Sequence, residues 1–347
     1  MGELLRIEQL KIRFESEYGR TQAVRGASLH IDEGETLAVV GESGCGKSVM
    51  GRSILGLLCK NATVEGSIRL CGREIVGLGE RALQDIRGRD AAIVFQDPMT
   101  SLTPTMPVGR QIAEAARIHT GLSRRQARER AIDLMAMVGI ERPAERFGQY
   151  PHQFSGGMRQ RCVFAMALAG NPRLLIADEP TTALDVTIQA KILELMADIR
   201  RQTRIAMLLI THDLGVVAQS ADRVAVMYAG KIVETGTVRE VFYDPRHPYT
   251  WGLMSSSPAA ELKNGRLRTI EGALPRNDRE IHGDAFAPRN PFALAIDYEE
   301  EPPMFQITET HSAATWLLDK RAPRIAAAAF VRDGKVIVRE EAECRHC

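Results

Sequence analysis

The sequence lacks the features that would place the chain across a membrane. No uninterrupted apolar run approaches the roughly 20 residues needed to span a bilayer. The first residues, MGELLRIEQL, have neither the basic start nor the apolar centre of a signal peptide. We therefore expect a cytosolic chain, with docking onto a membrane protein left open.

An excess of charge of one sign is also missing. The 45 basic side chains nearly balance the 44 acidic ones, so the formal net charge is +1. No global electrostatic field attracts nucleic acid or anionic lipid, but the net charge does not exclude local charged patches. The six cysteines are too scattered for a disulfide framework. The terminal CRHC, with Cys344 and Cys347, has no second ligand pair, which favours a solvated tail over a metal site.

The order of apolar and polar residues predicts an α/β fold with a helical insertion. Short strands are expected in about the first 90 residues, and a helical, charged pattern runs from Val108 to Ile140. Strands RLLIAD and RIAMLLITHD then flank the helix DVTIQAKILELMADIRRQT, which is the alternation typical of an α/β sheet. After about Tyr243, proline and loop residues mark an appended C-terminal region.

The strongest single motif is GESGCGKS, at residues 41–48, between the apolar run LAVV and the helical SVMGRSILGLL. It matches G-x-x-x-x-G-K-[ST], whose glycines let backbone amides wrap around phosphates. Lys47 would hold the β- and γ-phosphates, and the Ser48 hydroxyl would bind Mg²⁺. The expected nucleotide-binding residues are Gly41, Glu42, Ser43, Gly44, Cys45, Gly46, Lys47 and Ser48.

Two further strand ends carry candidate catalytic side chains. LLIADEP ends in Asp178, expected to hold Mg²⁺ through water, and Glu179, expected to orient and polarise the attacking water. His212 follows the apolar strand IAMLLIT and would contact the γ-phosphate. A solvated carboxylate pair and a structural histidine are the alternatives, which the neighbouring phosphate loop disfavours.

The stretch FSGGMRQR, at residues 154–161, has no obvious nucleophile or metal ligand. Its apolar residues continue at helical spacing, so the serine and glycines are expected at a helix N-terminus, where unpaired amides favour an anion. An ordinary helix cap explains these residues equally well.

Together, GESGCGKS, VFQDP, FSGGMRQR, LLIADEP, TTALD and THD resemble the ATP-binding cassette (ABC) ATPases over about residues 5–240. The resemblance implies a P-loop NTPase core with an antiparallel β subdomain. It also implies a helical subdomain over about 97–157, a nucleotide-binding domain over 1–243 and a C-terminal extension over 244–347.

The same resemblance assigns further residues. In this family Ser155, Gly156 and Gly157 would cap the ATP bound by a second chain, although FSGGM replaces the leucine and glutamine of the commoner LSGGQ. Gln96 would contact Mg²⁺ and water, and Tyr18 would stack on adenine. The loop around Asp185 would touch the opposite chain. The implied cofactors are ATP and Mg²⁺.

One branch of the family fits best. FQDPMTSLTP, TALDVTIQAKIL and HPYTWGLM look like the ATPases of oligopeptide, dipeptide and nickel importers. The implied partners are a second cassette chain, identical or homologous, two permease subunits and an extracytoplasmic solute-binding protein, without nucleic acid. The chain would lie on the cytoplasmic face of the membrane as a peripheral protein.

Relatives in this branch often carry four cysteines that bind an iron–sulfur cluster. The matching positions here are Asp284, Asn290, Asp297 and Thr315. Because this mixed set cannot replace thiolates, no cluster is expected. In the family that the chain resembles, tails without these cysteines are common among oligopeptide-type members, and this resemblance favours peptides over nickel as the solute. A soluble cassette ATPase acting on ribosomes or DNA is the second hypothesis. A small-molecule kinase is the third, and it leaves FSGGMRQR and His212 without a role.

Overall fold

The computed structural model describes residues 2–17, 19–182, 185–257, 260–261, 269–275 and 281–339. An antiparallel sheet at the N-terminus has the order β2-β1-β4-β5. Its strands are β1 (Glu3–Ser16), β2 (Gly19–Asp32), β4 (Ala62–Leu70) and β5 (Arg73–Glu74). The first two strands are long because they form one hairpin, in which Ile7 lies opposite Leu29 and Ile12 opposite Val24.

A bulge in β1 keeps the apolar side chains of this sheet on one face. Leu5 and Ile7 are buried, and so are Leu10 and Ile12, three residues further on instead of two. Gln9 between them has φ of +47°, and the pairing register shifts there. The bulge inserts one residue, so both halves of the strand face the same core.

The central sheet has the order β12-β13-β10-β9-β3-β8-β7-β6. Its middle strands are parallel and buried, because one face packs against the antiparallel sheet and the other against helices. The strands are β3 (Thr36–Val40), β6 (Ala91–Val94), β7 (Leu174–Asp178), β8 (Ala206–Thr211), β9 (Arg223–Tyr228), β10 (Lys231–Thr237), β12 (Phe305–Gln306) and β13 (Ser312–Ala313). Residues far beyond Tyr243 thus extend this sheet through β12 and β13.

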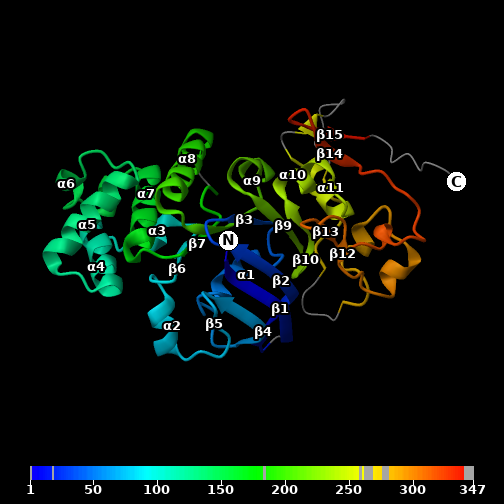
Figure 1. Ribbon diagram of the computed structural model, residues 1–347, viewed down its shortest axis with the longest axis horizontal. Helices are drawn as coiled ribbons and strands as arrows, with labels where there is room; N and C mark the ends of the chain where they lie inside the picture. Colours follow the sequence, from blue (N-terminus) through cyan, green and yellow to red (C-terminus); the bar gives the residue numbers. More distant parts are fainter. Residues whose placement is uncertain are drawn as a thin grey trace.

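A helical subdomain projects from the β6 edge of the sheet (Figure 1). It contains α3 (Pro98–Ser101), α4 (Val108–Thr120), α5 (Arg124–Met137), α6 (Pro143–Arg146) and α7 (Gly156–Ala167). Apolar positions such as Ile112, Ala131 and Leu134 are fully buried between these helices. The structure therefore confirms the predicted fold class, with its P-loop α/β core, antiparallel subdomain and inserted helices.

The remaining α-helices lie outside the helical subdomain, between or after the strands of the sheets. They are α1 (Lys47–Ser53), α2 (Glu80–Ile86), α8 (Val186–Thr203), α9 (Leu214–Ser220), α10 (Val238–Tyr243) and α11 (Pro248–Ser255). A small sheet of order β11-β15-β14 is formed by β11 (Ala260–Glu261), β15 (Lys335–Val338) and β14 (Ala329–Arg332). Two of its strands, β14 and β15, lie in the segment AAAAFVRDGKVIV, where apolar and polar residues alternate. Over the described ranges, none of the helices combines the length and apolarity needed to cross a membrane.

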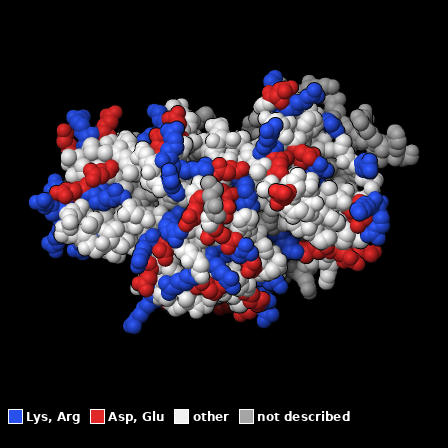
Figure 2. All heavy atoms as spheres, viewed as in Figure 1, with Lys and Arg blue, Asp and Glu red and all other residues white. Residues whose placement is uncertain are grey.

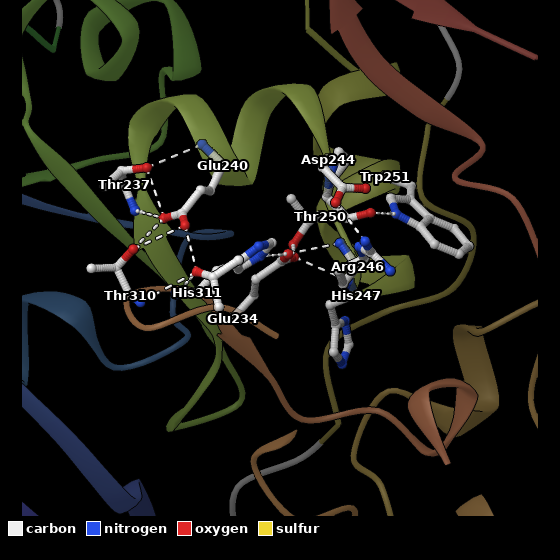
Figure 3. A network of polar contacts seen from close by, with 12 residues as sticks. Glu234, Thr237, Glu240, Asp244, Arg246, His247, Thr250, Trp251, Thr310 and His311 are labelled. Atoms are coloured by element: carbon white, nitrogen blue, oxygen red, sulfur yellow. Dashed lines mark hydrogen bonds and ion pairs between the residues drawn. The ribbon is translucent and has the colours of Figure 1, made fainter. Parts of the chain in front are cut away.

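A buried carboxylate ties the extension to the central sheet (Figure 3). Glu234 on β10 is fully buried and accepts hydrogen bonds from the backbone amides of Arg246 (2.7 Å) and His247 (3.1 Å). Thr250 Oγ1 donates to it at 2.5 Å, and His311 Nε2 lies 2.8 Å away. One side chain therefore joins β10, the HPYT segment and the strand pair at β13.

We expect Glu234→Ala to lower the free energy of unfolding by about 3–5 kcal/mol, because the substitution leaves several buried hydrogen-bond donors without an acceptor. Urea unfolding followed by circular dichroism measures this loss. Glu309→Ala, at an exposed glutamate of the same extension, serves as the control and should change stability by less than about 0.5 kcal/mol. Equal unfolding midpoints for the two variants would contradict the role given to this network.

Candidate functional site

The predicted phosphate loop lies between β3 and α1, at the carboxyl edge of the parallel strands. Two of its glycines are required by geometry. Gly41 has φ of +155° and a Cβ there would collide with the Met227 carbonyl oxygen, while Gly46 has φ of +105° and a Cβ would collide with that of Ala23. The loop is therefore pressed against β2 and β9, and any side chain at these positions would push it outward.

Lys47 is buried at the centre of this loop. Its Nζ donates to the carbonyl oxygens of Gly41 and Glu42, at 2.8 Å each. Ser43 and Gly44 at the tip of the loop are exposed. Burial raises the pKa of the Cys45 thiol, which favours packing in the loop over a thiolate. An ammonium group enclosed by a glycine-rich turn is the chemistry that a polyphosphate requires.

A hydroxyl and a carboxylate, two oxygen groups of the kind that bind Mg²⁺, lie close together beside the loop. Ser48 Oγ donates to Asp178 Oδ1 at 2.6 Å, which joins the start of α1 to the end of β7. Arg52 Nη2 lies 3.5 Å from Asp178 Oδ2, a contact that the sequence did not reveal. A hydroxyl and a carboxylate at this spacing fit Mg²⁺, which binds oxygen ligands and retains water.

The other predicted catalytic side chains, Gln96 and His212, both lie next to the Glu179 carboxylate. Gln96 Nε2 donates to its Oε2 at 3.3 Å, and His212 Nδ1 lies 3.6 Å from its Oε1. Thr182 Oγ1 also donates to Oε2, at 2.9 Å. Glu179 has φ of +50°, an uncommon backbone conformation for a residue with a side chain. Strained backbone of this kind is found most often at functional sites. Thr182 was missed, although it lies in the TTALD motif.

Ser155 and Asp185 both cap helices. Ser155 Oγ accepts from the Met158 amide at 3.3 Å and starts α7, while Asp185 Oδ1 accepts from the Ile188 amide at 2.9 Å and starts α8. A Cβ on Gly157 would lie 3.0 Å from Ile188 Cγ2, so the two helix starts are neighbours. Across the described ranges, no hydrogen bond joins residues 155–157 to residues 41–48.

Two predictions concern residues outside the described ranges. Tyr18, predicted to stack on adenine, lies outside the described residues. Cys344 and Cys347 of the terminal CRHC also lie outside them.

The four positions that correspond to cluster cysteines are buried, and each side chain accepts a hydrogen bond from a backbone amide through one oxygen. These bonds are Phe286 N to Asp284 Oδ1 (2.9 Å), Phe292 N to Asn290 Oδ1 (3.0 Å), Leu294 N to Asp297 Oδ2 (2.6 Å) and Leu317 N to Thr315 Oγ1 (3.3 Å). Burial raises the pKa of Asp284 to about 6. An oxygen set without thiolates does not fit an iron–sulfur cluster, so its absence stays our prediction.

The comparisons with known proteins agree with this geometry. Residues 24–182 match the ABC transporter family, and residues 233–296 match the oligopeptide/dipeptide transporter C-terminal region. The oligopeptide transport ATP-binding protein OppD of Bacillus subtilis is 54% identical over 325 residues, which cover 93% of this chain and 91% of OppD. The dipeptide transport ATP-binding protein DppD of Lactococcus lactis is 52% identical, with 93% of each chain covered.

Solved structures show the same fold. The ATP-binding cassette MJ0796, in a dimeric post-hydrolysis state bound to ADP and Pi, has a TM-score of 0.60 and 27% identity. The match covers 68% of this chain and 99% of that cassette. The chain therefore belongs to the ABC transporter family, among the ATP-hydrolysing subunits of the oligopeptide/dipeptide branch.

Proposed function

We propose that this chain hydrolyses ATP to drive uptake of oligopeptides or dipeptides through a membrane permease. The observation that carries the proposal is the convergence of Lys47, the Ser48–Asp178 pair and the Glu179 cluster at one edge of a parallel sheet. The match of residues 233–296 to the peptide-transporter C-terminal region supports the peptide solute.

Each side chain has a distinct task in hydrolysis. Lys47 and the loop amides bind the phosphates, and Tyr18 stacks on adenine. Ser48, Asp178 and Gln96 would hold Mg²⁺, which supplies positive charge next to the phosphates. Glu179 accepts a proton from the attacking water, and Gln96, Thr182 and His212 orient its carboxylate. His212 also contacts the γ-phosphate.

A second cassette chain completes the site in this proposal. Ser155, Gly156 and Gly157 present a helix N-terminus to the nucleotide of the partner chain. Ile188, in the first turn of the helix that Asp185 caps, lies against Gly157, and the loop around Asp185 would touch the opposite chain. The dimeric form of the MJ0796 cassette supports this arrangement. ATP binding then closes the two chains, and hydrolysis releases them.

A groove between the core and the helical subdomain suits the permease. It has a volume of about 730 Å³ and is lined by Phe95, Gln96, Thr100, Ser101, Ala115 and Met166, among others. Gln96 forms part of this groove and also touches Glu179, so a permease segment bound there would contact the catalytic cluster through one residue. The chain would dock in this way as a peripheral subunit on the cytoplasmic face, supplied with solute by an extracytoplasmic binding protein.

The alternatives have less support. On the face shown in Figure 2, acidic and basic side chains are interspersed and form no single-sign patch for nucleic acid. Import of nickel or another small solute keeps the same ATPase chemistry. It is disfavoured because OppD and DppD are named for peptides.

Uptake by cells tests this function. In cells lacking their own copy, the wild-type chain should restore uptake of a radiolabelled tripeptide or dipeptide, and Lys47→Ala should not, because ATP binding is lost. Lys60→Ala, at an exposed lysine, is the control that should transport normally. Peptide uptake that is independent of the chain, or restored nickel uptake alone, would overturn the proposed solute.

A further inference from the structure

An arginine of the C-terminal extension reaches into the phosphate loop. Arg289, at the end of the short 3₁₀ helix η3 (Ala287–Arg289), makes a two-pronged ion pair with Glu42, the first variable residue of GESGCGKS. Nη1 donates to Glu42 Oε2 at 2.7 Å and Nη2 to Oε1 at 2.9 Å. The Arg289 side chain is only 6% exposed, so water screens this pair weakly.

The guanidinium is fixed on its other edges as well. Nε donates to the Glu271 carbonyl at 2.9 Å, and Nη2 donates to the Ile270 carbonyl at 3.3 Å. Nη1 also donates to the Tyr228 hydroxyl at 3.2 Å, and the guanidinium lies 5.7 Å from the centre of that ring. Arg289 therefore has one well-defined position, set by the extension and β9.

Glu42 is held from the extension at two points. Its carboxylate binds Arg289, and its backbone amide donates to the Tyr249 hydroxyl of α11 at 2.8 Å. Its carbonyl oxygen accepts from Lys47 Nζ. Glu42 is thus one of the two residues, with Gly41, whose carbonyl oxygens hold the Lys47 ammonium, and Arg289 contacts Glu42 directly.

We propose that Arg289 is a positioning residue for the phosphate loop, which it holds through Glu42 in the shape that binds the phosphates of ATP. The inference rests on the proposed role of this loop as the nucleotide site. In this arrangement the C-terminal extension, which carries no residue of the hydrolytic cluster, contributes directly to nucleotide affinity. Arg289 does not touch the nucleotide itself.

Nucleotide affinity tests the inference on the full-length chain. Binding of a fluorescent ATP analogue should weaken about tenfold in Arg289→Ala, the size expected for loss of a charged, partly buried hydrogen-bonded pair. Arg289→Lys should recover part of this loss, because it keeps the charge without the fork. The kcat of the assembled complex should change less than about twofold, while KM for ATP rises. Arg321→Ala, which removes an exposed arginine paired with Asp319, is the matched control.

A double-mutant cycle separates positioning from simple attachment. If Arg289 acts through Glu42, then Glu42→Ala should weaken binding similarly, and the double variant should lose about tenfold, not the hundredfold expected of independent effects. Glu42→Ala leaves the extension intact, so it reports on the pair even if Arg289→Ala folds poorly. A lower melting temperature with unchanged nucleotide affinity in both single variants would overturn the inference.

The nucleotide site itself is checked in parallel with Lys47→Ala. If Lys47→Ala loses binding while Arg289→Ala and Glu42→Ala keep it, only the role of Arg289 is wrong. Retained tight binding by Lys47→Ala would overturn both the proposed site and this inference.

Discussion

Replacing Glu179 with glutamine should reduce ATP turnover by about 10²- to 10³-fold and leave ATP affinity within about twofold of wild type. The amide has the same shape and still accepts hydrogen bonds from Thr182 and Gln96, but it cannot take a proton from water. Phosphate release by the assembled complex measures turnover, and binding of a fluorescent ATP analogue measures affinity.

The control for this variant is Glu194→Gln, at an exposed glutamate of α8, which should hydrolyse ATP at the wild-type rate. Unchanged turnover in Glu179→Gln would remove Glu179 from the mechanism. A matched loss of affinity and turnover would instead mean that its carboxylate shapes the loop that binds ATP, through Gln96 or Asp178.

Much of the fold was predictable because its signals are local. The buried strands β3, β7 and β8 are continuous apolar runs, and α4, α5 and α8 carry helical periodicity. The phosphate loop could be located because glycines, lysine and serine occur within eight residues of sequence. The structure then brings Ser48, Asp178, Glu179, Gln96 and His212 together, as the carboxyl ends of parallel strands should.

The features that escaped prediction depend on partners distant in the sequence. Glu42 and Arg289 are separated by 247 positions, and nothing in the local pattern of either residue indicates the other. The same holds for Arg52 beside Asp178. The strands β12 and β13 each contain two residues, too few for an alternating pattern, so their addition to the central sheet could not be foreseen.

The central claim is that the proposed active site is shared between two chains, and Ser155 tests this claim most directly. Ser155→Arg should reduce turnover of the assembled complex by about 10²-fold or more, since a bulky side chain would occupy the space meant for the partner's nucleotide. ATP binding by the isolated chain should stay unchanged, because its own phosphate loop has no hydrogen bond to Ser155 within the described residues.

The matched control is Ser123→Arg, since Ser123 also caps a helix, α5, but has no proposed catalytic role. It should lose only the stability of a helix cap, about 1 kcal/mol, and keep its turnover. The decisive measurement is therefore ATP turnover against ATP binding for Ser155→Arg. Lost turnover with intact binding is the predicted result, and an equal loss of both, or activity equal to that of Ser123→Arg, would contradict a shared site.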